Sequence, residues 1–118
     1  MKTASPESAV KKKICEYLDT FSKHKLMFWV QSAGKIPGRI GKSKYQRNGI
    51  PDICAVYKGL SVFFEVKYEN GELSDAQNEF FYDCQLAGGY CFRVNSVDQV
   101  ITAIEYLDVV SSTALVDR

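Results

Sequence analysis

Two acidic residues and a lysine, Asp52, Glu65 and Lys67, are spaced so that a β-hairpin would bring them together. Apolar segments flank a turn at Gly59-Leu60, and glycine at the first turn position is typical of a type II′ hairpin. With that turn, Asp52 lies opposite Lys67, and Glu65 lies diagonally across from Asp52. Because alternate residues of a strand point to the same face, the three charged side chains are predicted to share one face of the sheet.

The opposite face of the same hairpin is entirely apolar. It consists of Ile53, Ala55, Val62, Phe64 and Val66. We expect that face to be buried, so that the three charged groups stand on a sheet whose other side forms the core.

Two carboxylates that share a face and leave coordination positions open suit Mg²⁺ or Mn²⁺, which retain water and take further ligands from phosphate. Lys67, one step along the same face, is able to stabilise phosphate charge or orient an attacking water. The three residues therefore have the chemistry required for metal-assisted phosphodiester hydrolysis. They also fit a half-solvated strand with a salt bridge between Lys67 and either carboxylate, and the spacing alone leaves both interpretations open.

The remaining elements follow from periodicity and capping patterns. A Ser-Pro pair opens an amphipathic helix, and two capping boxes, Ser74 to Gln77 and Ser96 to Gln99, open two more. The predicted segments are a helix over 5–22, a strand over 26–32, a loop over 34–49, strands over 52–57 and 62–68, a helix from 74 to a Gly-Gly stop at 88, a strand over 90–94 and a helix from 96, with a frayed tail from about 111. The predicted order is α, β, β, β, α, β, α.

Composition indicates an ordinary globular protein. The 118 residues, 46% apolar and 25% charged, predict a single domain spanning 1–118. No apolar run reaches the length that a bilayer requires, and the N-terminus lacks the apolar segment of a secretory signal, so we expect a cytoplasmic protein. The four cysteines form no C-x-x-C pair and are typical of reduced core thiols.

Charge is distributed unevenly along the chain. Residues 1–50 contain eleven basic and three acidic side chains, whereas residues 51–118 contain four basic and eleven acidic ones. A loop of basic residues immediately precedes Asp52, and its position favours contact with DNA phosphates. An exposed loop that serves only solubility is the alternative. The predicted DNA-binding residues are Lys35, Arg39, Lys42, Lys44 and Arg47.

Three segments of the chain resemble a known family. They are GIPDI (49–53), FFEVKYENGELSDAQ (63–77) and AGGYCFRVNSVDQV (87–100), and together they are similar to the virus-type replication-repair nuclease (VRR-NUC) domain of the PD-(D/E)XK superfamily, in particular its small stand-alone phage and bacterial members. The resemblance runs from about residue 7 to residue 107. It implies a restriction-endonuclease-like α/β fold, with a central mixed sheet of about four strands flanked by helices.

The resemblance also implies roles for individual residues. Asp52 and Glu65 match the metal-binding carboxylates, the backbone carbonyl of Val66 usually adds a metal ligand, and Lys67 matches the catalytic lysine. Two further positions match catalytic residues of the superfamily, Glu7 in the first helix and Gln77 in the helix after the hairpin. Glu7 also fits a first-turn acid that complements the helix dipole, and Gln77 also fits the third position of a capping box.

The implied activity is endonucleolytic cleavage of DNA with Mg²⁺ or Mn²⁺, on branched substrates such as a four-way (Holliday) junction. A homodimer would offer one active site to each of two symmetry-related strands. The alternatives are a non-catalytic nucleic-acid-binding module with the same fold and a metal-dependent exonuclease acting on DNA ends. The implied setting is the cytoplasm of a bacterial or phage-infected cell.

Overall fold

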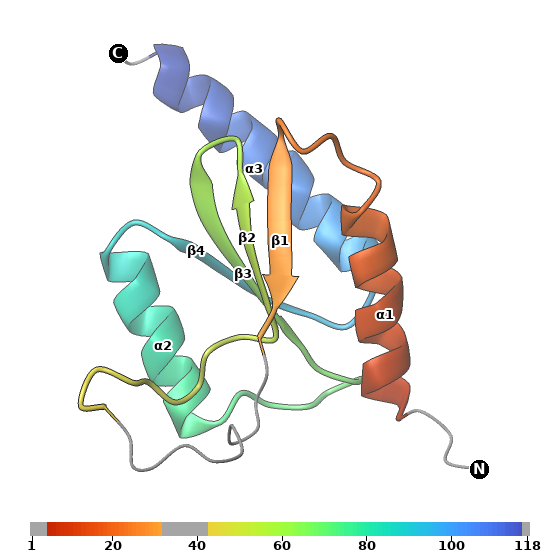
Figure 1. Ribbon diagram of the computed structural model, residues 1–118, viewed down its shortest axis with the longest axis vertical. Coiled ribbons are helices and arrows are strands. Elements are labelled where there is room, and N and C mark those ends of the chain that lie inside the picture. The colour runs from red at the N-terminus through yellow and green to blue at the C-terminus, as the bar shows by residue number, and fades with distance from the viewer. Residues whose placement is uncertain (1–4, 32–42, 117–118) are drawn as a thin grey trace.

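A four-stranded mixed sheet with the strand order β1-β2-β3-β4 forms the centre of the molecule (Figure 1). The computed structural model describes residues 5–31 and 43–116. Strands β1, β2 and β3 pair antiparallel, and β4 pairs parallel to β3. The elements in chain order are α1 (Pro6–Leu18), β1 (Leu26–Val30), β2 (Ile53–Tyr57), β3 (Leu60–Val66), α2 (Asp75–Leu86), β4 (Tyr90–Val94) and α3 (Val97–Val116). The predicted α/β fold class and element order are confirmed.

Helix α1 begins as predicted and ends earlier than predicted. The Ser5 side chain accepts a hydrogen bond from the Ser8 N–H at 3.1 Å, which caps the first turn. The helix ends at Leu18 rather than near residue 22. The apolar pattern extends to Phe21, which lies beyond the end of the helix. Its ring still packs edge-on against Tyr17, so the residue is apolar for a reason other than helix formation.

The hairpin turn consists of Lys58 and Gly59, so the predicted turn at Gly59-Leu60 is wrong by one residue. Lys58 and Gly59 have φ of 48° and 81°, and positive φ at both positions is the type I′ geometry rather than the type II′ geometry. The register is Ile53↔Phe64, which shifts every pair by two positions. A shift of two preserves the faces, and one step beyond that pair Asp52 comes opposite Glu65 instead of Lys67.

The apolar face of the hairpin is the core, as predicted. Its five residues are at most 3% exposed, and they pack against Ile14 and Leu18 of α1 and Val100 and Leu107 of α3. Burial of each Val, Ile or Phe side chain contributes about 2 kcal/mol to the stability of the fold. Both helices therefore dock on the face of the sheet opposite the charged residues.

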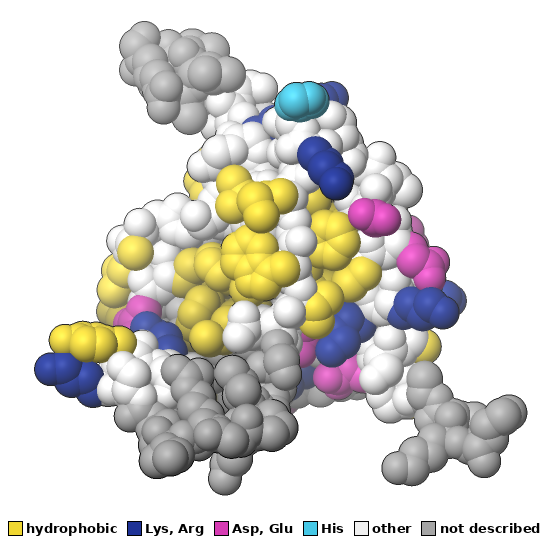
Figure 2. Space-filling model, in the orientation of Figure 1, with side chains coloured by type: hydrophobic (Ala, Val, Ile, Leu, Met, Phe, Trp, Pro, Cys, Tyr) yellow, Lys and Arg dark blue, Asp and Glu magenta, His cyan; other side chains and the backbone are white. Residues whose placement is uncertain are grey.

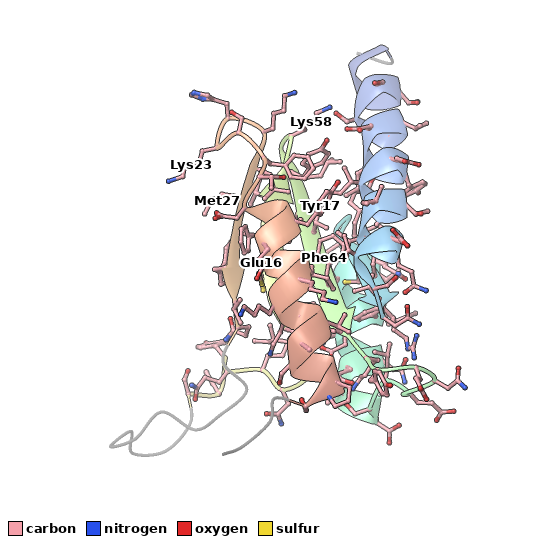
Figure 3. The ribbon with its side chains drawn as sticks, turned by 90° about the vertical axis from the view of Figure 1, so that its right-hand side faces the viewer. Glu16, Tyr17, Lys23, Met27, Lys58 and Phe64 are labelled. Atoms are coloured by element: carbon pink, nitrogen blue, oxygen red, sulfur yellow. The ribbon has the colours of Figure 1, made fainter. Side chains whose placement is uncertain are left out.

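Helix α2 covers only part of the other face. The ring of Phe80 on α2 contacts Phe63 on β3 edge-on at 5.2 Å between centroids. Next to it, Met27, Trp29 and Val56 form an exposed sheet patch on β1 and β2, and Figure 2 shows the hydrophobic side chains gathered on this face. Figure 3 shows Met27 on the side of the sheet away from α3, whereas Phe64 points toward the helices.

Helix α3 continues to Val116, past residue 111 where we expected the chain to fray. In the ranges that the structure describes, no helix is sufficiently long and apolar to cross a membrane. Cys54 and Cys91 are buried, and burial raises the pKa of both thiols.

Candidate active site

Asp52 lies at the entrance to β2, held by hydrogen bonds on both sides. Its Oδ2 accepts a hydrogen bond from the Val66 N–H at 2.9 Å, and its backbone carbonyl accepts one from the Gln31 N–H at 2.8 Å. The side chain is 18% exposed, so it reaches the surface. Because Oδ2 accepts the hydrogen bond from Val66, Oδ1 is the oxygen that remains for a cation.

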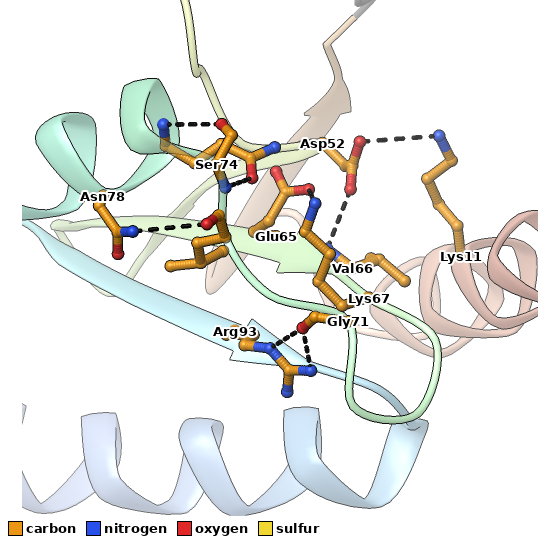
Figure 4. A network of polar contacts seen from close by, with 11 residues as sticks. Lys11, Asp52, Glu65, Val66, Lys67, Gly71, Ser74, Asn78 and Arg93 are labelled. Carbon is orange, nitrogen blue, oxygen red and sulfur yellow. Dashed lines mark hydrogen bonds and ion pairs between the residues drawn. The ribbon is translucent and has the colours of Figure 1, made fainter.

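Glu65 is a buried charge on the same face of the sheet. The residue is 3% exposed, and it stands across from Asp52 (Figure 4). Burial raises the pKa of its carboxyl to about 7, and the negative charge of Asp52 acts in the same direction. The Lys67 ammonium lies 3.6 Å from Glu65 Oε2 and lowers this pKa, but it offsets only part of the increase.

Lys67 follows β3 directly and is held by the backbone of the neighbouring strand. Its N–H donates to the carbonyl of Val94 at 2.9 Å. The loop beyond it is fixed by Arg93 of β4, which donates to the carbonyls of Gly71, at 2.8 Å from Nε, and Glu69, at 3.0 Å. The guanidinium of Arg93 thereby fixes the loop that follows Lys67.

Gln77 belongs to the capping box of α2. Its Oε1 accepts a hydrogen bond from the Ser74 N–H at 2.8 Å, and its own N–H donates to Ser74 Oγ at 3.2 Å. The capping interpretation of Gln77 therefore holds, while a direct role in the site stays a prediction.

Glu7 lies in the first turn of α1 and is partly buried. One helical turn later, Lys11 places its Nζ 4.0 Å from Asp52 Oδ1 (Figure 4). In residues 5–31 and 43–116, no third His, Cys, Asp or Glu side chain joins Asp52 and Glu65 in a group able to hold a metal ion. The structure thus brings together Asp52, Glu65 and Lys67, but not Glu7, and it adds Lys11.

The donor set of the site fits a hard divalent cation. Asp52 and Glu65 supply carboxylate oxygens, and Val66, between Glu65 and Lys67, has a backbone carbonyl that the family resemblance implies as a ligand. Two side-chain ligands are few for Zn²⁺, but they are sufficient for Mg²⁺ or Mn²⁺, which keep several waters and accept phosphate oxygens. The exposed part of Asp52 leaves access for such ligands.

Only part of the predicted DNA-binding loop can be placed. Lys35, Arg39 and Lys42 lie outside the described residues. Arg47 donates to Asp83 of α2 at 2.5 Å, and its guanidinium lies 5.2 Å from the centre of the Phe80 ring. Arg47 therefore attaches the described end of this loop, residues 43–49, to α2, whereas Lys44 is exposed.

Gly49 brings the segment that carries Asp52 into contact with α2. Its φ is +78°, and a Cβ at this position would overlap the carbonyl oxygen of Ala76 and the backbone nitrogen of Gln77. Only glycine fits such a conformation and approach without displacement. This contact fixes the distance between the first turn of α2 and the start of β2, where Asp52 lies.

Gly49→Ala is expected to lower the free energy of unfolding by about 2 kcal/mol, because it adds backbone strain and overlap with α2. Gly59→Ala is the matched control, because Gly59 has φ +81° and no neighbouring atoms within 4 Å of the added carbon. It should cost only the strain, about 1 kcal/mol. Urea denaturation of both variants measures the difference, and equal losses would contradict a tight contact at Gly49.

Two solved structures resemble this fold over most of its length. One, described as a "VRR_NUC domain", is 25% identical, has a TM-score of 0.62, and is matched over 86% of this chain and 97% of its own. Another, described as a "VRR_NUC domain protein", is 15% identical, with a TM-score of 0.57 and 89% of each chain covered. No protein-family model matches the sequence, and no curated protein matches it at a significant level.

Proposed function

We propose that this chain, assigned as a VRR-NUC domain by its fold and by the two solved structures it resembles, is a metal-dependent nuclease that hydrolyses DNA phosphodiester bonds. The observation that carries the proposal is the arrangement of Asp52 across from a buried Glu65, with the Lys67 ammonium 3.6 Å from Glu65 Oε2. Burying Glu65 beside Asp52 destabilises the fold, because two negative charges repel each other strongly where little water screens them. A site for a divalent cation explains why both are present.

Each residue has a distinct part in the proposed reaction. Asp52 and Glu65 would hold Mg²⁺ or Mn²⁺, with the Val66 carbonyl as a further donor. When bound, such an ion polarises the scissile phosphate and lowers the pKa of a water ligand. Lys67 would orient the attacking water or stabilise the charge that develops on the phosphate. The hydrogen bond from the Val66 N–H keeps the Asp52 carboxylate oriented, so that this side chain needs little reorganisation when substrate binds.

We further propose that the protein acts as a homodimer on branched DNA, in the cytoplasm of a bacterial or phage-infected cell. The exposed sheet patch supports the dimer, since Met27 and Trp29 are 55% and 45% exposed on β1, which is an edge strand. Apolar side chains gathered on one face and lying at a sheet edge are typical of an interaction surface. A two-fold dimer would match the two-fold symmetry of a four-way junction.

Trp29→Glu is expected to convert the dimer to a monomer, because it places a charge in the apolar patch. Leu86→Glu is the control, because Leu86 is an exposed apolar residue on α2, outside the patch. Light scattering across a concentration series reports the mass of each protein. A wild-type protein that stays monomeric up to micromolar concentrations would contradict the symmetric two-site proposal.

A cleavage assay tests the function itself. Labelled four-way junction, flap, duplex and single-stranded DNA are incubated with the protein in Mg²⁺, Mn²⁺ or chelator. Internal cuts in the junction, present only with metal, are expected. Binding without any cleavage would instead identify a nucleic-acid-binding module, and stepwise loss of nucleotides from ends would identify an exonuclease.

A further inference from the structure

Lys11 is a cation next to the proposed metal site that comes from a different element. It lies on α1, whose position is fixed by Ile14 and Leu18, both at most 1% exposed. Its ammonium is 4.0 Å from Asp52 Oδ1, and its side chain is one-third exposed. It is the only ion-pair partner of Asp52 in the part of the chain that the structure describes. The periodicity of α1 predicts only that Lys11 lies off its apolar stripe, facing water or phosphate, and the family resemblance implies no role for it.

The ammonium of Lys11 lies beside the same oxygen that a metal ion would use. Asp52 Oδ2 is engaged by the Val66 N–H, which leaves Oδ1 for a cation. A divalent ion on Oδ1 and an ammonium beside it repel each other, so the two compete for this carboxylate. Lys67 does not have this conflict with Oδ1, since its contact is with Glu65 Oε2.

We infer that Lys11 is the counter-ion of Asp52 when the site holds no metal and becomes a phosphate-binding residue when the metal is bound. This inference rests on the proposed function. The flexible side chain and its partial exposure allow the ammonium to turn from Asp52 toward a DNA phosphate at the same edge of the site. The metal and the DNA are thereby coupled, because loading the metal releases a positive charge for the substrate.

The inference predicts effects of opposite sign on the two ligands. Removing Lys11 removes a competitor of the metal, so metal affinity rises. It also removes a phosphate contact, so DNA affinity in the presence of metal falls. If Lys11 were only a solvent-exposed residue of the helix, its removal would change neither affinity. If it were only a general DNA contact, its removal would lower DNA affinity without changing metal affinity.

The experiment compares Lys11→Ala with Lys23→Ala, which removes the same charge from the far end of the sheet (Figure 3). Calorimetric titration with Mn²⁺, without DNA, is expected to show about fivefold tighter binding for Lys11→Ala and no change for Lys23→Ala. DNA binding is measured by fluorescence anisotropy with Mn²⁺ in a Lys67→Met background, where proposed cleavage is removed and both carboxylates remain. There, adding Lys11→Ala should weaken binding about fivefold and reduce the slope of log affinity against log salt by about one.

Lys11→Arg keeps the charge and should retain the wild-type behaviour in both measurements, which separates charge from any effect on folding. If Lys11→Ala matches Lys23→Ala in either measurement, the inference is overturned while the nuclease proposal stands. If the wild-type protein binds no divalent cation, the nuclease proposal is overturned as well.

Discussion

Asp52→Asn is expected to reduce Mg²⁺-dependent DNA cleavage by a factor of at least about a hundred, the scale of metal-based stabilisation of a transition state. The amide keeps the shape of the side chain and retains an oxygen to accept the Val66 N–H bond, so the variant should fold normally. In chelator it should bind junction DNA at least as tightly as the wild type, because a negative charge that repels phosphate has been removed. Initial cleavage rates and anisotropy titrations, made on the same preparation, measure both effects.

Asp108→Asn provides the matched control. Asp108 also pairs with a lysine, Lys58 at 2.8 Å, and accepts a hydrogen bond from Tyr57 at 2.6 Å, but it lies on α3 away from the site. Its substitution should leave cleavage unchanged. If Asp52 were only the partner of Lys11 in a partly exposed ion pair, its substitution would cost at most about 1 kcal/mol of stability and spare the activity. Retained cleavage by purified Asp52→Asn would therefore refute the site assignment.

Glu65→Gln is expected to stabilise the metal-free protein at pH 8 by up to about 3 kcal/mol, while abolishing metal binding. The folded-state pKa of Glu65 is raised to about 7 from an ordinary value of 4.5. Between these values the folded protein holds a proton that the unfolded chain has released. The contribution of Glu65 to the free energy of unfolding of the wild type therefore falls as pH rises from about 4.5 to 7, and it is lost once Glu65 is ionised in the folded protein.

Denaturant unfolding in chelator at several pH values measures this effect. The difference between Glu65→Gln and the wild type should be near zero at pH 4.5 and should reach its maximum above pH 7. Added Mg²⁺ at pH 8 should stabilise the wild type and leave Glu65→Gln unchanged. Glu16→Gln, at an exposed position on α1, is the control without a pH-dependent difference. A difference that does not change with pH would show that Glu65 is not the buried acid described here.

The sequence was sufficient to place the charged and apolar residues on opposite faces of the hairpin, even though the turn was displaced by one residue. The parity of a strand explains this result, because a register error of two positions leaves every side chain on its predicted face. The error arose at Lys58, a non-glycine residue with positive φ, which is uncommon enough that the sequence favoured glycine as the first turn position. The correct register brings Asp52 closer to Glu65 than the prediction did.

The contributions from outside the hairpin were harder to predict. Which residue of α1 lies beside Asp52 depends on the rotation of that helix on the sheet, and periodicity defines the buried stripe without fixing which polar neighbour borders the site. The family resemblance implied Glu7 as the residue of this helix in the site, whereas the structure places Lys11 beside Asp52. The role of Arg93 was not predicted for a related reason. Its partners are the backbone carbonyls of Glu69 and Gly71, and because every residue has such a carbonyl, the residue types at these positions do not indicate the contact.

The type I′ hairpin also has a consequence for how fast the protein folds. Asp52 and Glu65 are joined through the shortest connection in the sheet, whereas β1 reaches β2 across a long segment and β4 reaches β3 only after α2. Short loops close sooner and at lower entropic cost, so the two carboxylates meet early, before α2 and β4 have added their contacts. Their mutual repulsion then acts on the folding transition state, and neutralising either one should accelerate folding more than it slows unfolding. The residues proposed for catalysis would thus also set the height of the folding barrier.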